Sequence, residues 1–223
     1  MLTLGIDTAT ATGSVGLSDG SLSGELSFSA RMGQSERLVQ AIDRLLELNR
    51  VEVEDLELIA VSAGPGSFTG LRIGMATAKG LAQALKIPLL GVPTMESYMS
   101  RVDFWPGRIS VLIHDRRNLI YVAEFAAGEQ AVAERVEEIE RVLGKAEGKL
   151  FVGSGAELYR RELMERGGAI APRTLNLPSG LEVALLGAAE FAAREEDELF
   201  TLEPRYAQRP LAEIRFKERV IDR

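Results

Sequence analysis

A strand that enters a Gly-x-Gly turn and leaves it as a helix is the feature that most constrains the fold of this chain, because it occurs twice. In the first half, the apolar run 56–64 leads into Gly-Pro-Gly, and a helical pattern covers 67–86. In the second half, the run 149–155 ends in Gly-Ser-Gly, and a helical pattern covers 156–168. Strands that alternate with helices favour mixed sheets flanked by helices, which is an α/β fold.

Each half also carries a hairpin pattern and a final helical pattern, which indicates an internal duplication. In the first half, two strand patterns within 14–29 meet at Asp19-Gly20, a favourable hairpin turn. A helical pattern follows over 35–50, and the final helical pattern of this half covers 93–102. In the second half, strand patterns flank the turn 116–118, and the last helical pattern covers 179–196. The repeated order of elements predicts two related subdomains.

The run Phe-Trp-Pro-Gly at 104–107 marks the expected boundary. We expect an N-terminal subdomain of residues 1–103 and a C-terminal subdomain of residues 104–223, which includes the C-terminal tail. The tail carries two prolines and mixed charge, so we expect it to cross the surface as an extended segment with a mobile end.

Composition excludes several classes of site. A formal net charge of -7 argues against binding nucleic acid through a large basic surface. Cysteine is absent, so the chain forms no disulfide, thiolate nucleophile or cysteine-ligated zinc. No stretch reaches the ~18 apolar residues of a membrane span, and the start of the chain lacks a signal-peptide pattern. We expect a cytoplasmic protein that does not contact membranes.

The start of the helix over 67–86 is a candidate anion site, since a helix N-terminus presents unpaired amides and a partial positive charge. The candidate groups are the backbone of Gly64 and Gly66 and the hydroxyls of Ser67 and Thr69. A P-loop, however, carries Gly-Lys-Ser/Thr after its glycines, and here the corresponding stretch has no lysine. The turn alone therefore does not predict a nucleotide site.

A second phosphate-binding candidate follows the first strand, where Thr8 and Thr10 come after Asp7. An aspartate beside hydroxyls in a hairpin resembles the first phosphate loop of the actin, hexokinase and Hsp70 class of ATP-binding folds. These three residues are only weak candidates for nucleotide binding, because that class uses two such loops. The corresponding loop of the second half contains Asp115 but no glycine. ATP turnover by the chain itself stays an alternative, and no cofactor is expected.

The single histidine restricts metal and nucleophilic chemistry. His114 cannot form a two-histidine metal motif within the chain, and a Ser-His-Asp triad would have to recruit it. Ser67 stands at an expected helix N-cap instead of a Gly-x-Ser-x-Gly elbow, so its hydroxyl has a structural role. His114-Asp115 stays open as a base or single ligand, or as a polar pair at a strand end. We expect neither a metal site nor a catalytic residue.

The two long helices of the first half indicate a protein contact. The helix over 67–86 carries a small residue at every fourth position, a ridge that lets another helix backbone approach closely. The helix over 35–50 carries an apolar arc that covers roughly half its circumference. The expected partner interface comprises Leu38, Ile42, Leu45, Leu46, Gly70, Gly74, Ala78 and Ala82. The alternative is that both helices pack only against their own sheet and each other.

Five stretches in order along nearly the whole chain resemble the TsaB (YeaZ) family, bacterial partner proteins of tRNA threonylcarbamoyladenosine (t6A) synthesis. They are LGIDTATATGSVGL, GPGSFTGLRIGMATAKGLA followed by IPLLGVPTM, IHDRRNLIYVAEF, VGSGAELY and LEPRYAQRP. The resemblance implies an actin-like ATPase fold (ASKHA, RNase H-like) of two related subdomains, each with a mixed sheet flanked by helices. It also implies a non-catalytic paralogue of TsaD, which transfers threonylcarbamoyl to adenosine 37 of tRNAs reading codons that begin with A.

The same resemblance implies the partners. A protein of this family binds TsaD as a heterodimer through the two long helices of the first half, helps to recruit the ATPase TsaE, and forms a homodimer in isolation. It meets tRNA only through the complex. The expectation is therefore a scaffold and activator subunit. The alternative is a stand-alone ATP-binding or ATP-hydrolysing enzyme of the actin and hexokinase class.

Overall fold

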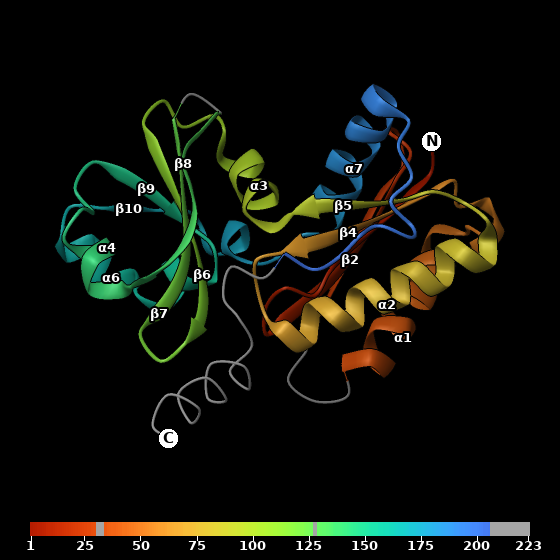
Figure 1. The fold of residues 1–223 in the computed structure, drawn as a ribbon, viewed down its shortest axis with the longest axis horizontal. Coiled ribbons are helices and arrows are strands. Elements are labelled where there is room, and N and C mark those ends of the chain that lie inside the picture. Colours follow the sequence, from red (N-terminus) through yellow and green to blue (C-terminus); the bar gives the residue numbers. More distant parts are fainter. Residues whose placement is uncertain (30–33, 127–128, 206–223) are drawn as a thin grey trace, which may run out of the picture.

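The structure, a computed structural model, describes residues 1–29, 34–126 and 129–205, and in them the chain forms two mixed sheets with helices on their faces (Figure 1). The first sheet has the order β3-β2-β1-β4-β5, and the second has the order β10-β9-β6-β7-β8. The strands of the first sheet are β1 (Thr3–Asp7), β2 (Thr12–Ser18), β3 (Ser23–Ser29), β4 (Leu58–Gly64) and β5 (Leu89–Pro93). Those of the second are β6 (Arg108–Arg116), β7 (Leu119–Ala126), β8 (Glu129–Glu138), β9 (Lys149–Val152) and β10 (Ala169–Ile170).

Both sheets have the same topology. In the first, β1, β2 and β3 pair in antiparallel order, β4 lies parallel to β1, and β5 lies parallel to β4. In the second, β6, β7 and β8 pair in antiparallel order, β9 lies parallel to β6, and β10 lies parallel to β9. This repetition confirms the predicted α/β fold of two related mixed sheets.

Helices cover both faces of the first sheet, with α1 and α2 on one face and α7 on the other (Figure 1). The helices are α1 (Gln34–Asn49), α2 (Phe68–Leu85), α3 (Thr94–Met99), α4 (Ile139–Leu143), α5 (Ser154–Leu158), α6 (Arg160–Glu165) and α7 (Gly180–Arg194). Short 3-10 turns are η1 (Val53–Asp55), η2 (Ser100–Val102) and η3 (Arg173–Asn176). None of the described helices combines the length and apolar character needed to span a membrane.

Helix bounds agree with the sequence for the long helices and differ for one short segment. The patterns over 35–50, 67–86 and 179–196 correspond to α1, α2 and α7 within two residues at each end. The single helix predicted over 156–168 is instead two, because Tyr159 leaves the helical region with φ -105° and ψ 26°. Strands β8 and β10 were not predicted, since neither shows a clean alternation of buried and exposed positions.

The last helix comes from the second half of the sequence but packs against the first sheet. The backbone amide of Gly180, at the start of α7, donates to the Ser14 hydroxyl in β2 (3.0 Å). A Cβ at Gly16 would overlap the backbone of α7, so this close approach requires glycine. The boundary at residues 103–104 therefore stays a prediction: the two sheets lie on either side of it, whereas α7 packs across it.

After α7, residues 197–205 run along β5, the edge strand of the first sheet. The Glu198 carboxylate accepts a hydrogen bond from the Gly91 amide (2.7 Å). The Arg205 amide donates to the Ala63 carbonyl oxygen (2.7 Å), so the segment reaches the turn before α2. The rest of the predicted crossing tail lies outside the described residues.

Candidate functional site

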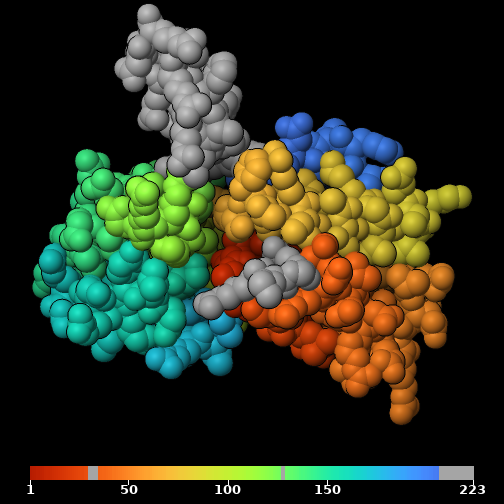
Figure 2. Space-filling view, turned by 90° about the horizontal axis from the view of Figure 1, so that it is seen from below, coloured from red at the N-terminus to blue at the C-terminus, as the bar shows by residue number. Residues whose placement is uncertain are grey.

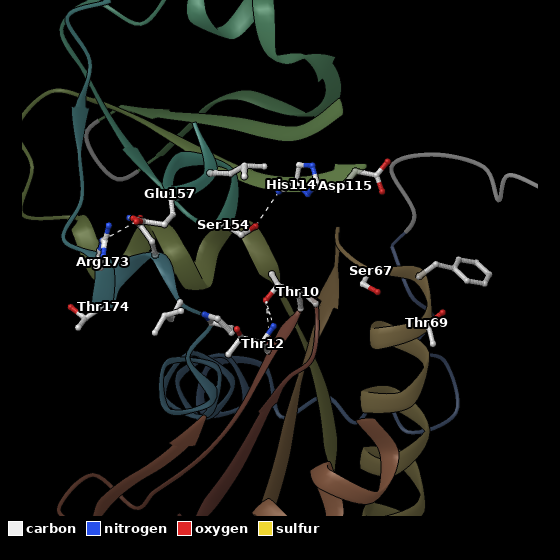
Figure 3. Close-up of a pocket in the computed structure, with 17 residues that line it drawn as sticks. Thr10, Thr12, Ser67, Thr69, His114, Asp115, Ser154, Glu157, Arg173 and Thr174 are labelled. Atoms are coloured by element: carbon white, nitrogen blue, oxygen red, sulfur yellow. Dashed lines mark hydrogen bonds and ion pairs between the residues drawn. The ribbon is translucent and has the colours of Figure 1, made fainter. Parts of the chain in front are cut away.

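A cleft of about 1030 Å³ opens between the two halves of the molecule (Figure 3). It brings the duplicated turns together, because Ser67 follows the first Gly-x-Gly and Ser154 lies within the second. Its hydroxyl groups belong to Thr10, Thr12, Ser67, Thr69, Ser154 and Thr174. Its apolar lining comes from Ala9, Ala11, Phe68, Leu158, Leu177 and Pro178, and its remaining side chains are His114, Asp115, Glu157, Arg173 and Asn176.

Of the three weak nucleotide candidates, only Thr10 lines the cleft. Asp7 and Thr8 are fully buried beneath it. The Asp7 carboxylate accepts hydrogen bonds from the Ala9 amide (2.9 Å) and the Ser62 hydroxyl (3.2 Å), both through Oδ1. The Thr8 hydroxyl donates to the Gly70 carbonyl oxygen (2.8 Å). Asp7 and Thr8 therefore connect the β1–β2 turn to its neighbours and do not present their side chains to a ligand in the cleft.

Burial dominates the electrostatics of Asp7. Loss of solvent raises the pKa of its carboxyl from 3.8 to about 6, against the lowering effect of the hydrogen bonds from Ala9 and Ser62. Its second oxygen, Oδ2, has no hydrogen-bond partner among the described residues. The nearby hydroxyl of Tyr98 is also buried, and burial raises its pKa. The floor below the cleft thus contains a carboxyl group that gains protons far more readily than an exposed one.

The start of α2 uses its polar groups within the protein. The Ser67 hydroxyl caps the helix by accepting from the Gly70 amide (3.2 Å), as its predicted N-cap role requires. The Ser67 amide donates to the Ala9 carbonyl oxygen (2.7 Å). In the facing hairpin turn, the Thr12 amide donates to the Thr10 hydroxyl (3.3 Å). On this wall of the cleft, the amides of Ser67, Gly70 and Thr12 therefore already donate to protein acceptors.

His114 and Asp115 line the opposite wall, at the end of β6 (Figure 3). The His114 backbone amide donates to the Ser154 hydroxyl (3.0 Å), and its ring Nε2 lies 3.2 Å from the Arg117 carbonyl oxygen. A carbonyl oxygen only accepts, so Nε2 is the donor in this contact. Among the described residues, no three His, Asp or Glu side chains are grouped so that they could hold a metal ion.

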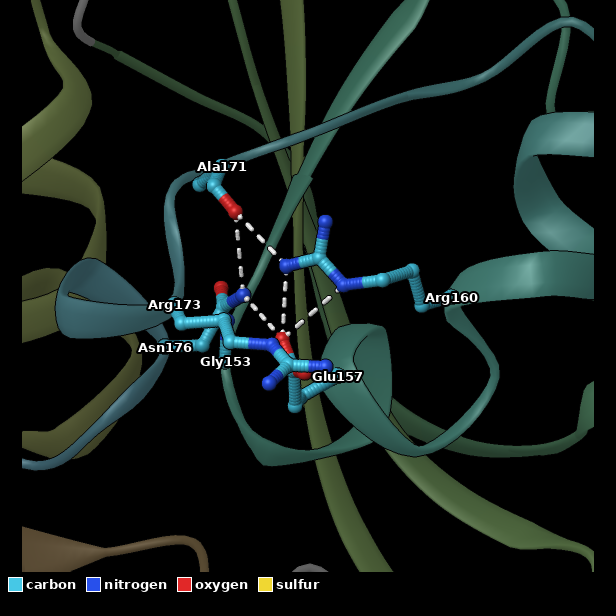
Figure 4. A network of polar contacts seen from close by, with 6 residues as sticks. All are labelled: Gly153, Glu157, Arg160, Ala171, Arg173 and Asn176. Atoms are coloured by element: carbon cyan, nitrogen blue, oxygen red, sulfur yellow. Dashed lines mark hydrogen bonds and ion pairs between the residues drawn. The ribbon is translucent and has the colours of Figure 1, made fainter.

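A polar network around Glu157 completes that wall (Figure 4). Glu157 Oε2 accepts from Arg160 (2.6 and 3.1 Å) and from the Asn176 amide (3.1 Å), while Arg173 contacts Oε1 at 3.0 Å. Hydrogen bonds from Arg160, before all other causes, lower the pKa of Glu157. Asn176 Oδ1 accepts from the Gly153 amide (3.0 Å). The Gly153 amide of the second Gly-x-Gly turn is thereby occupied by the Asn176 side chain.

The sequence did not single out Glu157, Arg173 or Asn176, although all three line the cleft. They lie in α5 and η3, which are too short for any periodic signal. The polar Arg-Thr-Leu-Asn stretch before the last helix was the one available hint, and it is equally compatible with a solvated loop.

The eight residues of the expected partner interface are all buried within the chain. The four leucine and isoleucine positions of α1 belong to the core of the first sheet. A Cβ at Gly74 would overlap the Thr8 hydroxyl, so this face of α2 packs against β1 and its turn. The internal alternative accounts for the glycine and alanine spacing. A role of these two helices in partner binding stays a prediction.

The exposed side of the same helix pair has a second ridge of small residues. Ala76, Gly80 and Ala84 of α2 are exposed and lie four positions apart, and a Cβ at Gly80 would meet no atom within 4 Å. The neighbouring α1 exposes Val39 (57%) and Leu48 (56%). Figure 2 shows α1 and α2 side by side on this surface.

Comparisons with known proteins agree with this architecture. A family model described as TsaD, tRNA N6-adenosine threonylcarbamoyltransferase, matches residues 29–219. The tRNA threonylcarbamoyladenosine biosynthesis protein TsaB of Bacillus subtilis is 29% identical over 98% of this chain and 99% of its own length. The TsaB of Escherichia coli is 34% identical over 64% of this chain and 62% of its own. The solved structure of YeaZ from Pseudomonas aeruginosa superposes with a TM-score of 0.74 at 26% identity, covering 92% of this chain and 99% of that one.

Proposed function

The chain belongs to the TsaB (YeaZ) family of tRNA threonylcarbamoyladenosine biosynthesis proteins, and on this premise we propose that it serves that pathway as a non-catalytic scaffold and activator of TsaD. TsaD would transfer threonylcarbamoyl to adenosine 37 of tRNAs that read codons beginning with A. The chain would bind TsaD as a heterodimer, help to recruit TsaE, and form a homodimer when TsaD is absent. Contact with tRNA would occur only within the complex.

The observation that carries this proposal is the exposure of Gly80 in the interior of α2, where no other described part of the chain contacts it. Glycine in a helix interior is less favourable than alanine by ~1 kcal/mol, so it calls for a compensating contact. The glycines at 70 and 74 are buried, and Gly74 has such a contact within the chain, whereas Gly80 faces open space. With Ala76 and Ala84 it forms a flat track along which a helix of another subunit can approach closely.

Two exposed apolar residues of α1 add apolar area to the outside of the helix pair, on opposite sides of this helix, since they are nine positions apart. Val39 and Leu48 are more than half exposed on a helix that otherwise shows charged and polar side chains to solvent. Burial of a leucine or valine side chain in an interface contributes roughly 1.5–3 kcal/mol. We therefore place the partner contact on the outer faces of α1 and α2, not on the buried ridge.

The cleft supports an accessory role more than ATP hydrolysis by the chain alone. The amides of Ala9, Thr12, Ser67, Gly70 and Gly153 all donate to protein acceptors. A triphosphate would have to compete with these bonds, and two carboxylates, Asp115 and Glu157, face the same space.

A binding experiment tests the proposed surface. Gly80→Leu should not destabilise the monomer, because leucine favours a helix and nothing occupies the space, yet it should weaken TsaD binding at least tenfold. The matched control is Ala192→Leu, an exposed alanine on α7. Calorimetric titration with TsaD measures the affinity for TsaD. Sedimentation of each isolated variant measures how much of it forms the homodimer. Unchanged affinity in Gly80→Leu would reject this contact.

The function itself is tested by threonylcarbamoylation of tRNA with and without this chain. We expect the reaction to require it, and undiminished modification in its absence would overturn the assignment. The enzyme alternative is tested separately by ATP turnover of the purified chain. Turnover that disappears in Thr12→Arg, which would fill the cleft, would favour that alternative.

A further inference from the structure

The segment after α7 holds a phenylalanine in solvent. Phe200 is 85% exposed, the most exposed of the large apolar side chains among the described residues. It lies in a turn closed by two hydrogen bonds, from the Thr201 amide (3.0 Å) and the Leu202 amide (2.8 Å) to the Glu198 carbonyl oxygen. Figure 1 shows this segment in blue, descending from α7 beside β5.

The turn is anchored on both sides of Phe200. Before it, the Asp197 carboxylate accepts from the Leu89 amide (3.0 Å) and the Leu199 amide (2.9 Å), so the edge of β5 holds the chain. After it, Leu202 is only 8% exposed and belongs to the core of the first sheet. The position of Phe200 is therefore fixed by its neighbours, and little backbone entropy remains to be lost when another molecule contacts it.

A hollow of about 500 Å³ lies beside the exposed ring. Its apolar lining comes from Ile87, Pro88, Phe191, Leu199 and Phe200, at the C-terminal ends of α2 and α7. A pre-positioned aromatic side chain next to an apolar hollow has the arrangement of an interface hot spot. The hollow is separate from the cleft, because α2 contributes its N-terminal end to the cleft and its C-terminal end here.

The charges around the hollow select the kind of occupant. Glu195 and Asp197 line it, Glu196 between them is exposed, and Lys86 is the one cation in its lining. This acidic rim disfavours an anionic lipid surface or a nucleic acid, and it favours lysine and arginine side chains.

We propose that Phe200 and this hollow form a docking site for a protein segment that carries a bulky apolar side chain flanked by basic residues. The apolar side chain enters the hollow against the Phe200 ring, and the basic residues meet Glu195 and Glu196. The proposal is independent of the contact assigned above to the outer faces of α1 and α2, since neither Gly80 nor Leu48 lines the hollow.

The test is fluorescence anisotropy with a short synthetic peptide that has a central Phe-Leu pair flanked by lysines. We expect saturable binding, at least tenfold weaker affinity for Phe200→Ala, and a change below twofold for Phe104→Ala, a 69% exposed phenylalanine outside this hollow. The Glu195→Lys/Glu196→Lys pair should also weaken binding at least tenfold. The matched Glu138→Lys/Glu140→Lys pair changes the net charge equally, at exposed positions elsewhere, and should have a much smaller effect.

Several results would overturn the proposal. They are absence of binding to the wild-type chain, equal losses in Phe200→Ala and Phe104→Ala, or equal losses in the two charge-reversal pairs. Self-association or binding to anionic phosphatidylglycerol vesicles that disappears in Phe200→Ala would assign the site to a second copy or to a membrane instead. Because Phe200 is exposed, its variant should unfold at the wild-type temperature, so lost binding cannot be attributed to misfolding.

Discussion

The two duplicated turns start from the same backbone geometry but are completed by different partners. Gly64 and Gly153 have φ of +108° and +104°, in the left-handed region that favours glycine. In the first turn, Ser67 caps a helix of 18 residues and its amide donates to the adjacent hairpin. In the second, the Gly153 amide donates to Asn176, and α5 ends after five residues.

The same supersecondary unit, a strand followed by a Gly-x-Gly turn and a helix, is therefore built differently in the two halves. The first turn is held by the adjacent hairpin, by the Ser67 cap and by the Arg205 amide, which donates to the Ala63 carbonyl oxygen, and a helix of 18 residues follows it. The second turn is locked by side chains from the loop before α7, so it forms a wall of the cleft and no long helix. The two copies of the unit therefore differ in the helix that follows the turn, although both copies line the cleft.

The largest expected effect comes from equivalent glycines of the two turns. A Cβ at Gly66 would lie 2.5 Å from the Ala9 carbonyl oxygen, whereas one at Gly155 would lie 3.0 Å from the Leu112 side chain. We expect Gly66→Ala to lower the free energy of unfolding by ~3 kcal/mol or more and Gly155→Ala by ~1 kcal/mol, since a contact at 3.0 Å needs a much smaller shift of its neighbour than one at 2.5 Å. Urea unfolding measures both. Equal losses of unfolding free energy in the two variants would contradict the difference between the two turns.

The next effect concerns Asp7, under the first turn. Its pKa of about 6 in the folded chain exceeds the ordinary 3.8, so folding favours the protonated form. Stability from this group is complete below about pH 4 and is lost as the pH rises through about 6. Relative to Asp7→Asn, the wild-type free energy of unfolding should therefore fall by about 3 kcal/mol between pH 3 and pH 8. Urea unfolding of both proteins across this range measures the gap, and parallel curves would contradict the prediction.

The smallest effect distinguishes two residues of the second turn's network. Asn176 is 3% exposed, and its loss would leave the Gly153 amide without an acceptor, so Asn176→Ala should lower the free energy of unfolding by ~2 kcal/mol. The Arg173 side chain is 82% exposed, so Arg173→Ala should change the free energy of unfolding by less than ~0.5 kcal/mol. Unfolding curves and hydrogen exchange at Gly153 provide the measurement. The reverse order would show that surface charge, not the buried amide, holds this turn.

Sequence patterns predicted those features of the fold that depend on short stretches of chain. The Asp19-Gly20 turn, the Ser67 cap and the bounds of α1, α2 and α7 follow from local residue preferences, and the structure confirms them. The candidate site was predicted only in part. Thr10, Ser67 and His114 do line the cleft, whereas Asp7 is buried beneath it, because the direction of a side chain after a strand depends on what covers that strand.

The sequence by itself determined the alternation of strands and helices, their duplication and the family, because these depend on periodicity and on local motifs. Only the tertiary structure decided which side of α2 faces solvent. Both the ridge through Gly74 and the ridge through Gly80 consist of small residues four positions apart, so periodicity cannot rank them. The contact of Gly74 with Thr8, in the turn after β1 and more than sixty residues earlier, buries one ridge and leaves the other exposed.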